Sequence, residues 1–196
     1  MNYTINHIGQ IISPGGSFKN EAVIEHLVID SRKVYFPETS LFFALKGVQQ
    51  NGHQYINDLY KKGIRYFVVS ENMDTVLYPS ALFIKVEDTL AALQKLAASH
   101  RKHFSYPVIG ITGSNGKTIV KEWLFQLLNN EFDIVRSPKS YNSHVGVPLS
   151  VWQMNDTYDL AIFEAGISLP GEMKNLQAII DPSIGIFTFL GEAHAE

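Results

Sequence analysis

Short apolar runs alternate with amphipathic segments along most of the chain, which is the pattern of an α/β fold built on parallel strands. In the first half, apolar runs predict strands at residues 27–29, 41–45, 66–69 and 82–86. One helix is predicted over residues 53–62, ending at Gly63. A longer helix is predicted from Asp88, a suitable N-cap residue, to about His103.

The pattern restarts after Pro107, which cannot extend the preceding helix and favours an extended Tyr106. We therefore place a domain boundary near residue 105, between an α/β domain at 1–105 and a second one at 106–196. Strands are predicted at 108–111, 160–163 and 184–189, and helices at 117–128, after Pro148, and at 171–180. The apolar face predicted for the 117–128 helix contains Val120, Trp123, Leu124, Leu127 and Leu128.

The second domain has three clear predicted strands, whereas a typical sheet has roughly 5–6. We therefore expect these 196 residues to be part of a longer protein.

Composition narrows the classes of protein without identifying one. A net charge of -3 provides no electrostatic drive toward nucleic acid, and the basic cluster at Arg101–His103 is interpreted as a solvated helix end. The absence of cysteine excludes disulfides and thiolate chemistry. Neither a signal peptide nor an apolar run of ~20 residues occurs, so we expect a soluble, cytoplasmic protein that is not inserted in a membrane.

The strongest chemical signal is a loop with the sequence TGSNGKT between a predicted strand and a predicted helix. Backbone N–H groups and the helix dipole at such a junction attract phosphate. A lysine in the loop reaches the terminal phosphates and a hydroxyl ligates Mg²⁺. The general pattern has glycine where this chain has Ile111. The candidate nucleotide-binding residues are Thr112, Gly113, Ser114, Asn115, Gly116, Lys117 and Thr118.

Glu164, His194 and Glu196 are expected at the same sheet edge as this loop, because parallel sheets bind ligands at the carboxyl ends of their strands. Glu164 ends an apolar strand and is a candidate Mg²⁺ ligand, although a strand-terminal glutamate alone is more often simply solvated. His194 and Glu196 follow the next strand and are candidates for a metal or phosphate role. Asn142 lies in a polar loop and is a candidate to orient a phosphate or a metal-bound water. The alternative is a structural role as a turn or N-cap residue.

Taken in order, these motifs resemble those of the Mur ligase family: TGSNGKT with Lys121-Glu122, the segment 142–149, the E-x-G-x-x-x-x-G-E segment at 164–172, and 193–196. The resemblance implies that Lys117 binds phosphate, Thr118 and Glu164 bind one Mg²⁺, His194 binds a second, and Asn142 is an active-site asparagine. It also implies that the N-terminal domain holds a UDP-sugar. The residues in that region are Asp30, Ser31, Arg32, Lys46, Gly47 and His53.

The Lys-Glu pair and the 164–172 segment favour the family member that joins D-Ala-D-Ala to UDP-N-acetylmuramoyl-tripeptide. The resemblance implies that ATP and Mg²⁺ are the cofactors and that the reaction passes through an acyl phosphate. We expect a monomer. The family's C-terminal domain, which brings the amino substrate, is not among these residues, so we expect the 196-residue piece to be inactive by itself. Phe189 departs from the family, which usually has asparagine there. The alternatives are another Mur ligase, a folylpolyglutamate-synthase-like ligase, a nucleotide-gated switch, and a non-catalytic UDP-sugar-binding module.

Overall fold

The computed structural model describes residues 3–16, 18–47, 50–166, 171–189 and 191. These residues form two compact units, Met1–Leu96 and Ala97–Glu196. Each unit is built on a four-stranded parallel sheet, which confirms the predicted α/β class. Among the described residues, no helix is both long enough and apolar enough to cross a bilayer.

The sheet of the first unit has the strand order β3-β4-β5-β6. The four strands agree with the predicted ones to within two residues: β3 (His26–Val28), β4 (Ser40–Phe43), β5 (Tyr66–Val69) and β6 (Leu82–Lys85). Phe42 and Phe67 pack on one face of this sheet with α2 (Ile56–Lys61). The 3-10 helices are η1 (Pro37–Thr39), η2 (Gly52–Tyr55), which leads into α2, and η3 (Thr75–Leu77). Gly63 ends the helix with a φ of 104°, as glycine does at a helix terminus.

The sequence did not predict the first elements of the chain. The strands β1 (Tyr3–Thr4) and β2 (Val23–Ile24) pair antiparallel, and α1 (Ile5–Ile12) follows β1. The Thr4 hydroxyl caps α1 by accepting a hydrogen bond of 3.2 Å from the backbone N–H of His7. Two-residue strands give too short an alternation to detect from the sequence.

The helix α3 (Thr89–Arg101) begins where the sequence predicts, because Oδ1 of Asp88 accepts hydrogen bonds from the N–H groups of Leu90 and Ala91. The division between the two units falls inside this helix. The boundary near residue 105 stays a prediction. The interpretation of Arg101 as a solvated helix end is wrong. Its guanidinium is buried and donates to the carbonyls of Ile180, Phe104 and Asp181, since a buried cation needs acceptors on every side.

The sheet of the second unit has the strand order β10-β7-β9-β8. Three of its strands were predicted, and β10 ends two residues earlier than expected. The strands are β7 (Val108–Thr112), β8 (Ile134–Arg136), β9 (Leu160–Glu164) and β10 (Ile184–Phe187). β8 is an unpredicted edge strand of three residues, one of them charged.

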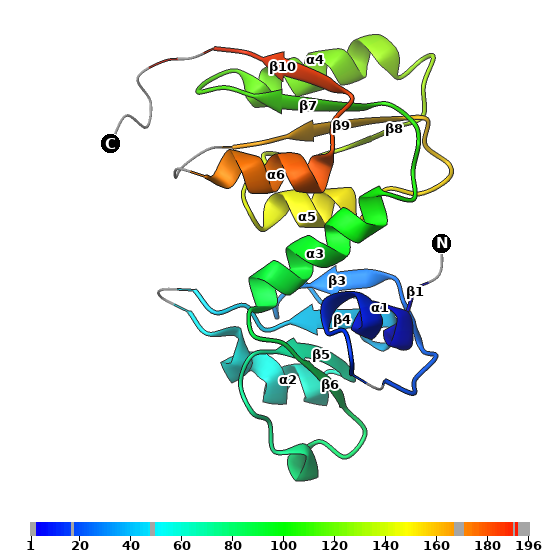
Figure 1. The fold of residues 1–196 in the computed structure, drawn as a ribbon, viewed down its shortest axis with the longest axis vertical. Coiled ribbons are helices and arrows are strands. Elements are labelled where there is room, and N and C mark those ends of the chain that lie inside the picture. Colours follow the sequence, from blue (N-terminus) through cyan, green and yellow to red (C-terminus); the bar gives the residue numbers. More distant parts are fainter. Residues whose placement is uncertain (1–2, 17, 48–49, 167–170, 190, 192–196) are drawn as a thin grey trace. The chain divides into compact units, whose positions relative to one another are not determined.

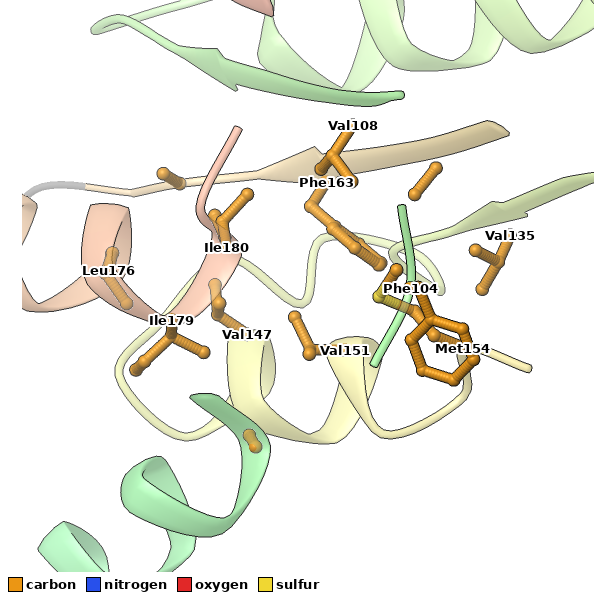
Figure 2. Packing of buried hydrophobic residues seen from close by; sticks show 13 residues of the cluster. Phe104, Val108, Val135, Val147, Val151, Met154, Phe163, Leu176, Ile179 and Ile180 are labelled. Carbon is orange, nitrogen blue, oxygen red and sulfur yellow. The ribbon is translucent and has the colours of Figure 1, made fainter. Parts of the chain in front are cut away.

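Helices cover both faces of this sheet (Figure 1). α4 (Lys117–Leu128) packs on one face, against Ile109, Ile111, Leu160 and Ile162. α5 (Gly146–Val151) and α6 (Glu172–Ile180) pack on the other face, against Val108 and Phe163. Figure 2 shows side chains of α5 and α6 gathered beneath Phe163.

The apolar face predicted for α4 is only partly correct. Val120, Leu124 and Leu128 pack against the sheet. Trp123 is 63% exposed and Leu127 is 74% exposed. Apolar side chains surround more of this helix than one flat sheet can cover, so Val120, Leu124 and Leu128 are partly buried against the sheet while the other two face solvent.

Candidate functional site

The loop between β7 and α4 adopts a backbone that depends on two glycines. Gly113 has a φ of 136° and Gly116, the N-cap of α4, has a φ of 86°. A Cβ atom on Gly113 would lie 2.3 Å from Oγ1 of Thr188 and 2.9 Å from the backbone N of Phe189. Both glycines are therefore required by conformation, and Gly113 is also required by close packing.

The chain that leaves β10 fastens this loop in place. The Ser114 N–H donates to the Phe189 carbonyl at 2.7 Å, and the Ser114 hydroxyl contacts both the N–H and the carbonyl of Gly191. The Thr188 hydroxyl donates to the carbonyl of Asn115. Since Phe189 acts here through its main chain, this contact is available to any residue at that position. Phe189 as a whole is 58% exposed.

Lys117 is the first residue of α4, and its side chain folds back over the loop. Its Nζ donates to the carbonyl of Gly113 at 2.6 Å and lies 3.4 Å from that of Ser114. The N–H groups in the first turn of any helix lack intrahelical acceptors. A cation and free N–H groups thus share one end of α4, an arrangement that suits an anion.

Thr118 and Glu164 are brought together from α4 and β9. The Thr118 hydroxyl donates to Oε2 of Glu164 at 3.0 Å, and the glutamate side chain has no exposed surface. Adjacent ligands of octahedral Mg²⁺ lie about 3 Å apart, because Mg–O distances are about 2.1 Å. Two oxygens with this spacing, beside a loop suited to an anion, fit the Mg²⁺ that a nucleotide would bring.

Lys121, one turn further along α4, is also completely buried. Its Nζ donates to the carbonyl of Ser137 at 2.8 Å and to that of Lys139, and forms ion pairs with Oε1 of Glu164 at 2.9 Å and with Glu122 at 3.1 Å. The sequence marked Lys121 as part of a family motif but not as a member of the site. A lysine is normally solvated, and only the fold reveals its burial.

Glu122 completes this group of charges at the surface. Its second oxygen pairs with Arg136 at 3.2 Å, and the Arg136 guanidinium lies over the ring of Phe125. Burial raises the pKa of the Glu122 carboxyl. The contacts with Lys121 and Arg136 together lower it by more, so the pKa lies below its usual value.

Asn142 lies beside the chain that leaves β9. Its carbonyl accepts a hydrogen bond of 2.7 Å from the N–H of Gly166, and a Cβ atom on Gly166 would lie 3.0 Å from Oδ1 of Asn142. Asn142 therefore contacts the chain two residues beyond Glu164, the last residue of β9. His194 and Glu196 lie outside the described residues. Within the described part of the chain, no three His, Asp or Glu side chains gather as a metal site.

The first unit carries its candidate residues at the carboxyl ends of β3 and β4. Asp30 accepts three hydrogen bonds from Arg32, one from its backbone N–H and two from its guanidinium, at 2.8 to 3.0 Å. These hydrogen bonds lower the pKa of the Asp30 carboxyl to about 2. The Ser31 carbonyl accepts from Lys62 at 2.9 Å, and the Arg32 side chain is 86% exposed. These hydrogen bonds hold the turn, and Arg32 presents a cation to solvent.

His53 is buried and connects η2 to the end of β5. Its Nε2 accepts from the N–H groups of Ser70 and Glu71, and its Nδ1 lies 2.7 Å from Oδ1 of Asn51. These partners require a neutral ring protonated at Nδ1, in agreement with a pKa lowered mainly by burial. Both ring nitrogens are therefore occupied by the fold.

Lys46 and Gly47 lie on the neighbouring turn. Lys46 pairs with Glu71 at 3.3 Å, Asn51 donates to the same carboxylate oxygen at 2.9 Å, and the Gly47 N–H donates to the carbonyl of Gln50. Glu71 was not predicted from the sequence, since an isolated glutamate after a strand gives no distinguishing signal.

Two family profiles match this chain. The profile described as Mur ligase family, catalytic domain, matches residues 23–101, and the Mur ligase middle domain matches residues 111–196. The UDP-N-acetylmuramoyl-tripeptide–D-alanyl-D-alanine ligase of Bacillus subtilis is 29% identical over 98% of this chain and 42% of its own length. The enzyme of the same name from Treponema pallidum is 36% identical over 84% of this chain and 37% of its own length.

Solved structures share this fold. MurF from Acinetobacter baumannii superimposes with a TM-score of 0.84 over 95% of this chain and 41% of its own, at 24% identity. The MurF ligase from Thermotoga maritima, crystallised in complex with ADP, gives a TM-score of 0.77 at 30% identity over 88% of this chain and 39% of its own. The chain thus spans about two fifths of the length of the relatives it matches.

Proposed function

The chain belongs to the Mur ligase family, and from that membership we propose that its full-length gene product is an ATP-dependent ligase that joins D-Ala-D-Ala to UDP-N-acetylmuramoyl-tripeptide. The observation that carries the proposal is the contact between Thr118 and Glu164 at the start of a helix that follows a phosphate-binding loop. The ligases of Bacillus subtilis and Treponema pallidum have this activity in their names.

The reaction explains why such a protein needs a nucleotide site and no nucleophilic side chain. The terminal carboxylate of the peptide attacks the γ-phosphorus of ATP, which gives an acyl phosphate and ADP. The amine of D-Ala-D-Ala then attacks the acyl carbon, loses a proton and displaces phosphate, so that an amide bond replaces the acyl–oxygen bond. Phosphoryl transfer depends on positioning and charge neutralisation more than on covalent catalysis.

The residues of the second unit suit those two requirements. Lys117 and the N–H groups at the start of α4 hold the phosphates, with Gly113 and Gly116 giving the backbone its close approach. Thr118 and Glu164 supply the oxygens that would hold Mg²⁺. The bound ion would neutralise charge on the transferred phosphoryl group. Asn142 is proposed as an active-site residue beside them, and His194 as the ligand of a second Mg²⁺.

The candidate residues of the first unit are proposed to bind the UDP end of the peptide substrate. Arg32 is exposed and fixed by Asp30, so it is available to an anionic diphosphate. His53 has both ring nitrogens engaged, and we assign it the role of shaping the turn that carries Lys46 and Gly47. We also propose that the protein is a cytoplasmic monomer whose domains meet near residue 105.

The test is phosphate release by the full-length gene product. We expect release only when ATP, UDP-N-acetylmuramoyl-tripeptide and D-Ala-D-Ala are all present, and mass spectrometry should detect the pentapeptide product. Release without the dipeptide would indicate a nucleotide-gated switch. Turnover with a single amino acid in place of the dipeptide would indicate a different Mur ligase or a folylpolyglutamate-synthase-like enzyme. Substrate binding without turnover would indicate a non-catalytic module.

A further inference from the structure

We propose that Lys121 is a positioning residue that holds the Glu164 carboxylate so that only one of its oxygens, Oε2, faces the cation of the nucleotide site. The inference rests on the proposed function, because it concerns the cation that a bound nucleotide brings. It adds to that function a residue that is not itself a phosphate or metal ligand.

The Lys121 ammonium group is fully engaged by protein groups. Its Nζ lies 2.9 Å from Oε1 of Glu164 and 3.1 Å from Glu122, and it also donates to two backbone carbonyls. Oε1 accepts no hydrogen bond of good geometry within the described residues, so this contact is an ion pair. Lys121 therefore acts through Glu164.

The position of Nζ is itself fixed by the backbone. Two carbonyls, those of Ser137 and Lys139, accept hydrogen bonds from it. The Ser137 hydroxyl in turn accepts a hydrogen bond of 3.1 Å from the N–H of Glu164. One residue, Ser137, thus holds both the lysine and the strand that carries the glutamate.

The two oxygens of Glu164 are consequently in different environments. Oε1 faces Lys121, whereas Oε2 faces the Thr118 hydroxyl at 3.0 Å. A carboxylate free to rotate could bind a cation with both oxygens. With Oε1 held by an ammonium group, Glu164 is left to bind through Oε2 alone, on the side where the phosphate loop lies.

The experiment measures ADP binding to the full-length protein by calorimetry, over a series of Mg²⁺ concentrations and in EDTA. Lys121→Met is compared with wild type and with Lys174→Met, a control at an exposed lysine on α6. We expect Lys121→Met to raise the Mg²⁺ concentration for half-maximal tightening of ADP binding about 10-fold or more, as loss of groups that orient metal ligands does. ADP affinity in EDTA should stay that of wild type.

The second part of the experiment uses a protein in which Glu164 has lost its carboxylate. In Glu164→Gln, adding Lys121→Met should leave the Mg²⁺ response unchanged, because the lysine then has no carboxylate to position. An unchanged Mg²⁺ midpoint in Lys121→Met alone, with only a lower melting temperature, would overturn the proposal and leave Lys121 a purely structural residue.

A crystal structure of the wild type with ADP and Mg²⁺ tests the inference even if Lys121→Met does not fold. Mg²⁺ on Oε2 with Nζ within ~4 Å of Oε1 supports it; both oxygens on the metal, or a withdrawn Lys121, overturns it. If the wild type is an active ligase but Lys121→Met has the wild-type Mg²⁺ concentration for half-maximal tightening of ADP binding, only this inference is overturned. If that Mg²⁺ concentration rises in Lys121→Met but the wild type has no ligase turnover, only the proposed function is overturned.

Discussion

The Thr118 hydroxyl and Oε2 of Glu164 lie 3.0 Å apart, although 46 residues separate them in the sequence. The parallel register of the sheet brings about this meeting, because Ile111 at the end of β7 pairs with Glu164 at the end of β9. The helix that follows β7 then places its second residue against the carboxylate. Two oxygens suited to Mg²⁺ thus meet as a direct result of strand order.

Replacing Thr118 by valine should weaken Mg²⁺-dependent ADP binding at least ~10-fold, since it removes one oxygen and keeps the shape of the side chain. Thr118→Ser retains the hydroxyl and should bind as wild type does. Calorimetry with and without Mg²⁺ measures both. Equal binding by the valine and serine variants would contradict the placement of the cation at this pair.

Replacing Lys117 by alanine in the full-length protein should reduce the rate of phosphate release at least ~10²-fold, the typical loss when one group that stabilises developing charge is removed. The same change at Lys174, which is exposed on α6, is the matched control. A Lys117→Ala variant with wild-type turnover would rule out the loop as the phosphate site.

Gly113→Ala should lower the free energy of unfolding by about 1–3 kcal/mol, because the new methyl group collides with Thr188 and Phe189 at a φ of 136°. Gly185 is the control, since a Cβ atom there has no neighbour within 4 Å. Urea unfolding of both variants makes the comparison. If Gly185→Ala proved as destabilising as Gly113→Ala, the close packing of the loop would not be the cause.

His100 should make the second unit less stable in acid. Burial lowers the pKa of its ring from 6.5 to about 4, so unfolding takes up a proton between these values. The stabilisation is fully present above pH 6.5 and is lost as the pH falls toward 4, a change of about 3 kcal/mol by linkage.

Urea unfolding between pH 4 and 7.5 tests this expectation. Trp152, whose ring lies 4.8 Å from that of His100, is a local fluorescence probe once Trp123, the other tryptophan, is replaced by phenylalanine. A His100→Gln variant should show a flatter pH dependence. Parallel curves for the two proteins would show that another group causes the acid sensitivity.

Much of the fold was predictable because the strongest signals are local. The four strands of the first sheet, the cap at Asp88 and the limits of α4 each follow from a run of neighbouring residues. β8 was missed because three residues carry little periodicity. Trp123 and Leu127 were assigned to the buried face of α4 because the sequence shows which side chains are apolar but not which of them the sheet covers.

The candidate site was predictable only in part, for a related reason. The loop residues are contiguous, and Glu164 ends a clear strand, so the sequence indicates both as candidates. Lys121 was not, because its buried partners Ser137, Lys139 and Glu164 come from the loop after β8 and the end of β9, far from it in the sequence. A polar residue with distant partners looks the same in sequence as a solvated one.

The contacts of Ser114 with Phe189 and Gly191 also bear on how nucleotide would be captured. Fixing the backbone of a free loop on binding costs about 1–2 kcal/mol of conformational entropy per residue. Here the fold has already imposed that order before any ligand arrives. Association would then need no slow ordering step, and its rate would be set by diffusion and by the field of the helix terminus.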